Sequence, residues 1–126
     1  MSLTTPLFLA LLMTTAAPAV DFETDIMPIL TKAGCNVGAC HGAAIGRGGF
    51  KLSLYGGDST ADYDAIVHQL EGRRVNFAAP EDSLFILKPT NSIGHGGGER
   101  LEIDDEAVQR IVSWLNQGAP QTSHRK

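Results

Sequence analysis

The two cysteines of the chain lie close together, and a histidine directly follows the second of them. The segment from Cys35 to His41 reads CNVGACH, so four residues separate the two cysteines. Two cysteines followed by a histidine are typical of covalent haem attachment, although the usual signal has only two residues between the cysteines. Each sulfur can form a thioether with one haem vinyl group while the adjacent imidazole binds the iron. We therefore predict that Cys35 and Cys40 tether one haem c and that His41 is its proximal iron ligand.

The longer spacing is compatible with this interpretation, because only the adjacency of Cys40 and His41 has to be strict. Cys35 needs only to reach the second vinyl group, and Gly38 gives the intervening loop backbone freedom to bulge. Two interpretations without haem use the same residues. In the first, the cysteines form a short disulfide in an exported protein. In the second, they bind zinc together with His41 and a further ligand such as His95.

An electron-carrying haem iron usually has a second axial ligand, for which the chain offers Met27, His68, His95 and His124. Met27 lies in an apolar helical pattern and is most simply a core residue. His68 lies on a predicted helix surface, and His124 lies in the polar tail. His95 is surrounded by glycines in the segment 93–98, where the backbone can approach a flat macrocycle closely. This pattern favours His95 as the distal ligand.

Short helices are the elements that must position these residues. Apolar side chains recur at helical spacing, and acidic residues or helix-capping residues precede several of the runs. We expect helices over 21–33, with a late start or a kink caused by Pro28, over 59–70, capped by Ser59 or Thr60, over 80–88 and over 104–117. Alternation over 50–55 predicts one short strand or extended segment. Glycine-rich loops, one of them containing the two cysteines, join these elements.

The last predicted helix has an apolar face and a marked beginning. Three acidic residues at 104–106 precede it, as is favourable at a helix N-terminus. Val108, Ile111, Val112 and Leu115 form the expected buried stripe, with Trp114 beside them. Gly118-Ala119-Pro120 ends the pattern.

The beginning of the chain has the composition of a secretory signal peptide. Residues 1–19 contain no charged side chain, and an apolar run is followed by Ala17-Pro18-Ala19. We expect cleavage after Ala19 and export to the periplasm or beyond. Because the apolar run is too short to cross a bilayer, no membrane span is expected after cleavage. The expected organisation is a signal peptide over 1–19, one domain over 20–120 and a disordered tail over 121–126.

Length and charge restrict the classes of protein that fit. The chain has 126 residues, enough for one compact domain. Its net charge of -4 gives no support to nucleic-acid binding. Aromatic residues are only 6% of the chain, so aliphatic side chains or a bound group must supply much of the core.

Taken in order, these pieces resemble the class I c-type cytochrome domain, in the form found in exported planctomycete proteins. The resemblance lies in Asp25–Leu30, Cys40–Gly42, Ser83–Leu84 with Lys88–Pro89, His95–Gly98 and Trp114–Pro120. It implies a small all-α fold around one haem, with the first and last helices crossing near Phe22 and Trp114. It also implies that His41 and His95 are the proximal and distal ligands. The spacing from Cys35 to Cys40 departs from the ordinary family pattern.

The resulting prediction is an exported monohaem electron carrier, not an enzyme, that exchanges electrons with a redox partner protein of unknown identity. Two other classes of protein stay open. A haem enzyme or gas-binding sensor would need an open distal site. A haem-free module would be held by a disulfide or by zinc.

Overall fold

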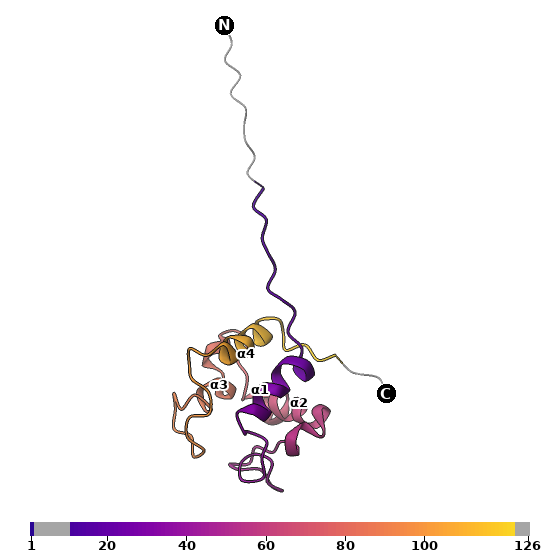
Figure 1. The fold of residues 1–126 in the computed structure, drawn as a ribbon, viewed down its shortest axis with the longest axis vertical. Helices are drawn as coiled ribbons and strands as arrows, with labels where there is room; N and C mark the ends of the chain where they lie inside the picture. The colour runs from indigo at the N-terminus through magenta and orange to yellow at the C-terminus, as the bar shows by residue number, and fades with distance from the viewer. Residues whose placement is uncertain (2–10, 123–126) are drawn as a thin grey trace.

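The computed structural model describes Met1 and residues 11–122, and within this part short helices alternate with irregular loops (Figure 1). The predicted mostly helical fold is confirmed for these residues, which form no β-strand beyond an isolated bridge between Arg47 and Phe50. The elements in chain order are η1 (Phe22–Ile26), α1 (Met27–Lys32), η2 (Leu54–Gly56), α2 (Ser59–Val67), η3 (Gln69–Gly72), η4 (Pro80–Asp82), α3 (Leu84–Leu87) and α4 (Glu106–Asn116).

The first helix changes from π-helical to α-helical winding just before Pro28. Asp21 caps η1, a π-helical turn, by accepting hydrogen bonds from the backbone N–H groups of Glu23 and Thr24. The regular helix α1 starts only at Met27, with Pro28 in its first turn, where a missing N–H costs little. Of the two predicted effects of Pro28, a late start or a kink, the late start is confirmed for the regular helix, which begins at Met27.

Helix α2 differs from its prediction at both ends. Its cap is Asp58, whose carboxylate accepts from the N–H of Ala61, rather than Ser59 or Thr60. It ends at Val67 and not near residue 70. Leu70 has a left-handed backbone with φ 55, as does the residue after it, which breaks the helical path.

The segment 50–55, predicted as a short strand or an extended segment, forms no strand among the described residues, for a physical reason. No second extended segment among the described residues lies beside it to supply a ladder of hydrogen bonds. The N–H of Leu52 instead donates to the carbonyl of His41 at 2.7 Å, and η2 follows from Leu54. This segment therefore packs against the cysteine-containing loop.

Aromatic side chains join the first and last helices, as expected. The ring centroids of Phe22 and Trp114 lie 5.6 Å apart, and Tyr63 from α2 meets Phe22 edge-on at 5.3 Å. Trp114 Nε1 donates to the carbonyl of Pro120 at 3.0 Å, and the hydroxyl of Tyr63 donates to that of Ala119. Trp114 is fully buried and Val112 only half-buried, so the tryptophan belongs to the buried face of α4.

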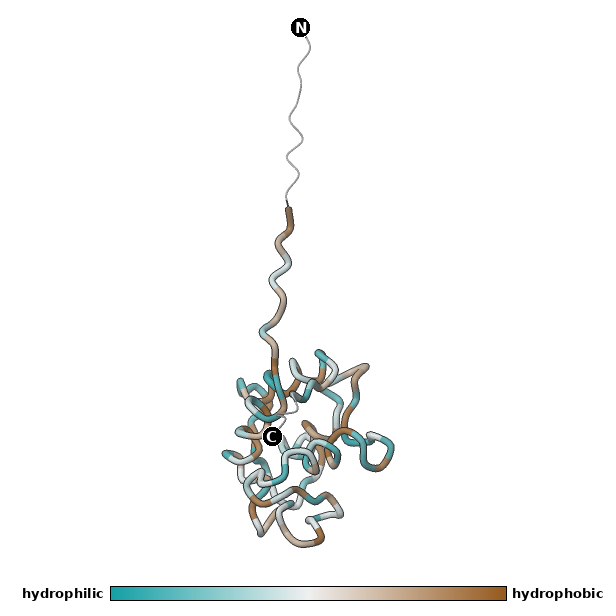
Figure 2. Tube along the Cα trace, turned by 90° about the vertical axis from the view of Figure 1, so that its right-hand side faces the viewer, coloured by the Kyte–Doolittle hydropathy of each residue, from teal (hydrophilic) through white to brown (hydrophobic). Residues whose placement is uncertain are grey.

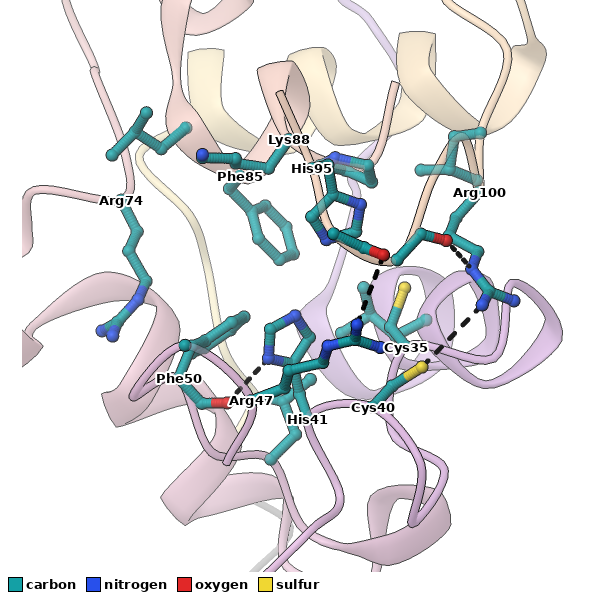
Figure 3. A pocket seen from close by; sticks show the side chains of 18 of the residues that line it. Cys35, Cys40, His41, Arg47, Phe50, Arg74, Phe85, Lys88, His95 and Arg100 are labelled. Atoms are coloured by element: carbon teal, nitrogen blue, oxygen red, sulfur yellow. Dashed lines mark hydrogen bonds between the residues drawn. The ribbon is translucent and has the colours of Figure 1, made fainter. Parts of the chain in front are cut away.

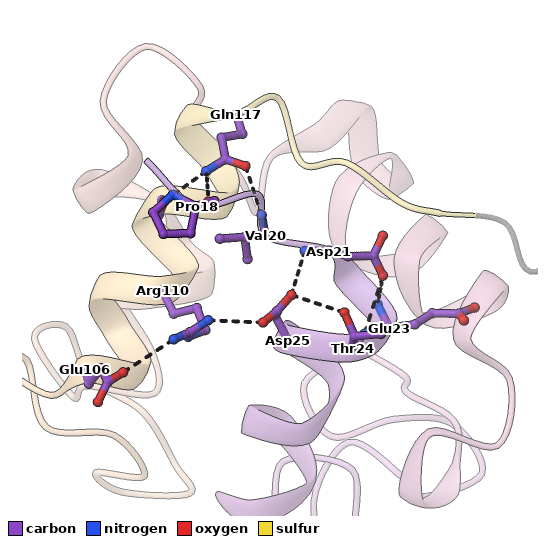
Figure 4. Close-up of polar contacts among 10 residues, drawn as sticks. Pro18, Val20, Asp21, Glu23, Thr24, Asp25, Glu106, Arg110 and Gln117 are labelled. Carbon is purple, nitrogen blue, oxygen red and sulfur yellow. Dashed lines mark hydrogen bonds and ion pairs between the residues drawn. The ribbon is translucent and has the colours of Figure 1, made fainter. Parts of the chain in front are cut away.

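Polar contacts reinforce this crossing (Figure 4). Arg110 of α4 pairs with Asp25 of η1 at 3.1 Å. Gln117 accepts from the N–H of Val20 at 3.0 Å and donates to the carbonyl of Pro18 at 2.9 Å. The start of the expected domain is therefore attached to the end of α4.

The two ends of the chain leave the helical body in different ways. Residues 11–19 are exposed and extend away from it as a partly apolar segment (Figure 2). The N–H of Thr122 donates to the Asp21 carboxylate at 2.6 Å. The rest of the predicted tail, with His124, and residues 2–10 of the predicted signal peptide lie outside the described residues. Among the described helices, none has the length and apolar character needed to span a membrane.

The buried face of α4 allows a direct stability test. Ile111 is 0% exposed, so Ile111→Ala removes buried methyl groups and leaves a cavity. We expect the free energy of unfolding to fall by about 2–5 kcal/mol, measured by chemical denaturation. Gln109→Ala, an exposed change on the same helix, is the control and should cost much less. Equal losses for both variants would contradict the observed orientation of α4.

Candidate functional site

A cavity of about 440 Å³ brings the four predicted site residues together (Figure 3). Cys35, Cys40 and His41 line it from the loop after α1, and His95 lines it from the loop before α4. Its volume lies in the range of ligand pockets, roughly 300–1,000 Å³. The walls are mainly apolar, with side chains from α1, α3, α4 and the loops between helices. The apolar wall residues are Leu30, Phe50, Leu52, Leu70, Leu84, Phe85, Pro89, Leu101 and Ile111.

Hydrogen bonds close the long loop between the cysteines. The N–H of His41 donates to the carbonyl of Cys35 at 3.0 Å, and the N–H of Cys40 donates to that of Val37 at 3.0 Å. Asn36 is fully buried, and its side-chain amide donates to the hydroxyl of Thr31 at 2.9 Å. The four intervening residues therefore form a compact turn that ends with His41 facing the cavity.

The glycine that this turn requires is Gly42, not Gly38. Gly38 has no left-handed φ, and a Cβ built there would meet nothing within 4 Å. A Cβ on Gly42 would overlap the carbonyl oxygens of Asn36 and Val37, the second at 2.8 Å. Gly38 therefore does not supply a left-handed backbone to this loop, whereas Gly42 allows backbone atoms to approach closely next to His41.

Both imidazole rings are oriented by backbone carbonyls. His41 Nδ1 lies 2.7 Å from the carbonyl oxygen of Phe50, and His95 Nδ1 lies 2.7 Å from that of Gly98. A carbonyl only accepts, so each Nδ1 carries the hydrogen and each Nε2 keeps a free lone pair. Such a second partner on the other ring nitrogen is the usual arrangement of metal-ligating histidines.

The two rings lie on opposite sides of the cavity with nearly parallel planes (Figure 3). The ring centroids of His41 and His95 are 6.3 Å apart, and the planes differ by 23°. A histidine nitrogen lies about 2 Å from a metal it binds, so rings on opposite sides of one ion have centroids about 6 Å apart. This spacing leaves room for one ion between the rings, whereas directly stacked rings would be closer.

The protonation state of His41 suits a ligand. Burial lowers its pKa below the ordinary value of 6.5, and the hydrogen bond to Phe50 opposes this only in part. The ring is therefore neutral at pH 7, as metal binding requires.

The same pKa shift predicts how the haem-free protein responds to acid. Between the lowered pKa of folded His41 and 6.5, the unfolded chain binds more protons than the folded one, so stability falls as the pH falls below about 6.5. Chemical denaturation at about pH 7 and about pH 5.5 measures the loss. We expect a smaller loss in His41→Gln. An unchanged pH dependence in that variant would refute the assignment.

Five cations line the cavity, whereas none of its lining residues is acidic. This is notable in a chain whose net charge is -4. The positive potential favours a ligand that carries negative groups. The cations are Arg47, Arg73, Arg74, Lys88 and Arg100.

Two of these arginines connect the loops that carry the histidines. Arg47 donates to the carbonyl of Gly96 at 3.4 Å. Arg100 donates to that of Gly97 at 3.0 Å and lies 3.9 Å from Cys40 Sγ. The thiols are free, and burial raises the pKa of Cys35 to about 11, so its sulfur is a protonated thiol at pH 7.

The other ligand candidates lie elsewhere. Met27 is buried in the core against Gly56 and does not line the cavity. His68 is exposed and lies 3.2 Å from Asp64. In the described part of the chain, no three His, Cys, Asp or Glu side chains are grouped as a site for a metal ion held by protein ligands alone.

Sequence reasoning missed Phe50 and Arg74. Phe50 contributes a backbone carbonyl, which has no sequence signature, and a ring whose centroid lies 4.6 Å from that of His41. Arg74 follows another arginine in the sequence, and nothing in that pattern points to a place beside the ring of Phe50. Comparisons with family models, curated proteins and solved structures gave no match for this chain. The assignment of a function therefore depends on the residues and geometry of the cavity.

Proposed function

We propose that this protein is an exported monohaem c-type cytochrome that transfers electrons, with a fold of the class I type. The observation that carries this proposal is the imidazole pair of His41 and His95, spaced at 6.3 Å with both Nδ1 atoms bound to carbonyls. The chemistry that the bound haem would supply is reversible one-electron transfer at its iron. Electron transfer to a separate redox protein requires no catalytic side chains in this chain.

Each of the four site residues has a separate part. Cys35 and Cys40 would tether the haem from neighbouring points of the cavity wall. His41 and His95 would present their Nε2 lone pairs from opposite sides, because their Nδ1 hydrogens are already donated. Ligation by two histidines is expected to give a lower reduction potential than ligation by histidine and methionine. The position of Met27 outside the cavity supports this choice.

The remaining lining residues also suit haem. Apolar walls exclude water from a flat macrocycle, and the positive cavity complements its two carboxylate side chains. Neutral His41 requires no proton loss on binding iron, because burial has already lowered its pKa. The proposed all-α cytochrome fold places these groups on loops that α1, α3 and α4 support.

The test is a pyridine haemochrome spectrum of the denatured protein, purified after export from a host with c-type maturation factors. Wild-type protein should show the band of haem bound through two thioethers. Cys35→Ser and Cys40→Ser should each show the band of a single thioether. A single-thioether band in wild-type protein would remove Cys35 from its role and keep the cytochrome assignment.

Other outcomes would favour the other classes of protein. Colourless protein from a host that matures other c-type cytochromes would overturn the proposal. Bound zinc or a Cys35–Cys40 disulfide in that protein would identify the haem-free module. A high-spin spectrum that shifts when carbon monoxide is added to the reduced protein would indicate a haem enzyme or gas sensor.

A further inference from the structure

Arg74 is a buried cation whose position the proposed function does not explain. It is 8% exposed and lines the cavity, and no ion pair among the described residues includes it. A buried charge without an opposite charge is costly, so its position needs a compensating role. Its guanidinium lies 4.4 Å from the ring centroid of Phe50, the residue that orients His41 (Figure 3).

Arg74 is fixed at both its backbone and its side chain. Its carbonyl accepts from the N–H of Phe85 at 2.9 Å. Its Nη1 donates to the carbonyl of Ala65 in α2 at 2.8 Å. The guanidinium is therefore held by packed helices while its face covers the Phe50 ring. The planar guanidinium of an arginine can donate and stack at the same time, whereas the compact ammonium of a lysine has no planar face to stack on a ring.

Phe50 needs such support because the glycine-rich segment before it does not fix its conformation. Gly46, Gly48 and Gly49 precede it, all with left-handed φ values of 64 to 76. Glycine gives a loop many conformations, so contacts from outside must select one. The Phe50 ring contacts both Arg74 and His41. Its centroid lies 4.4 Å from the guanidinium carbon of Arg74 and 4.6 Å from the centroid of the His41 ring.

We propose that Arg74 is a positioning residue: it clamps the Phe50 ring, so that the Phe50 carbonyl holds His41 in the ligating orientation. Where haem is bound, which rests on the proposed function, the fixed charge of Arg74 also favours the reduced iron. Cation–π contacts of this kind strengthen when they are removed from water. The nearby cation Arg73 also lines the cavity but is exposed, so it is a matched control for charge alone.

The first experiment needs no haem. Long-range ¹H–¹⁵N NMR of the haem-free protein reports which nitrogen of His41 carries the hydrogen. Wild type and Arg73→Gln should show the Nδ1–H form. Arg74→Gln should show a mixture of the two forms, and Phe50→Leu, which keeps the carbonyl, should do the same. An unchanged Nδ1–H form in Arg74→Gln would overturn the positioning role, whether or not the protein binds haem.

The second experiment uses the holoprotein and measures its reduction potential by spectroelectrochemistry. Arg74→Gln should lower the potential at low and at high salt, because a buried charge is poorly screened. Arg73→Gln should lower it less, and only at low salt. If both variants lowered the reduction potential equally and only at low salt, Arg74 would act only as a surface charge, and its special role at the iron would be excluded. Arg74→Lys should recover part of the potential but not the single form of His41.

Failure of this inference differs from failure of the proposed function. A colourless wild-type protein contradicts the haem assignment, and the NMR result then decides the role of Arg74 alone. A normal cytochrome spectrum with an unaffected Arg74→Gln variant contradicts the clamp and leaves the haem assignment intact. Circular dichroism of each variant verifies that the fold is retained.

Discussion

His41→Ala is expected to abolish accumulation of the haem-bearing protein. The variant removes the ring that follows the second cysteine and leaves no other imidazole in the loop 35–50. Loss of even an outer partner of a metal ligand costs about 10–100-fold in affinity, so loss of the ligand should reduce holoprotein by more than about tenfold. The measurement is haem absorbance per mole of exported chain, compared with total chain detected by immunoblot.

His68→Ala is the matched control for this result. His68 is exposed, does not line the cavity and contacts Asp64 and the Tyr63 ring, so its removal should leave the haem content unchanged. Wild-type haem content and a normal low-spin spectrum in His41→Ala would show that another group is the proximal ligand. A haem content reduced equally in both variants would indicate a general effect on export and not on ligation.

His95→Ala is expected to keep the haem attached and to change the spin state of the iron. In the proposed cytochrome, tethering would depend on the cysteines and His41, which lie together in sequence and far from His95. Without the distal ring, the iron of the proposed cytochrome would lose its sixth ligand, and the spectrum should change from low-spin to high-spin. Absorption and electron paramagnetic resonance spectra of the oxidised protein measure this change.

Two additions sharpen this second prediction. Added imidazole should enter the space left by the His95 ring and restore a low-spin spectrum. Carbon monoxide should bind the reduced variant but not the reduced wild type. An unchanged six-coordinate low-spin spectrum in His95→Ala, without added imidazole, would exclude His95 as the distal ligand.

The sequence predicts most of the helices because their signals are local. Asp105 before an apolar stripe marks the start of α4, and Pro28 marks the start of α1. The sequence does not predict the features of the fold that tertiary contacts determine. Asp58 outcompetes Ser59 as a cap, and Val112, which the helical spacing placed on the buried stripe, is only half-buried while Trp114 is fully buried.

The candidate site likewise contains residues that the sequence predicts and contacts that only the folded structure shows. Cys35, Cys40, His41 and His95 could be selected from residue type and spacing, and the structure places all four around one cavity. The carbonyl groups that orient the two rings have no side-chain signature and could not be selected. Arg74 could not be selected either, since its role depends on a contact with Phe50 that only folding creates.

Nearby carbonyl groups orient each histidine ring, whereas the distance between the two rings depends on the folding of the whole domain. His41 is held by a carbonyl nine residues away, and His95 by one only three residues away. The two rings themselves are 54 residues apart in the chain. Local contacts form early and distant ones late, because closing long loops costs chain entropy. In the proposed cytochrome, covalent tethering would therefore be able to precede folding, whereas ligation by His95 would report that folding is complete.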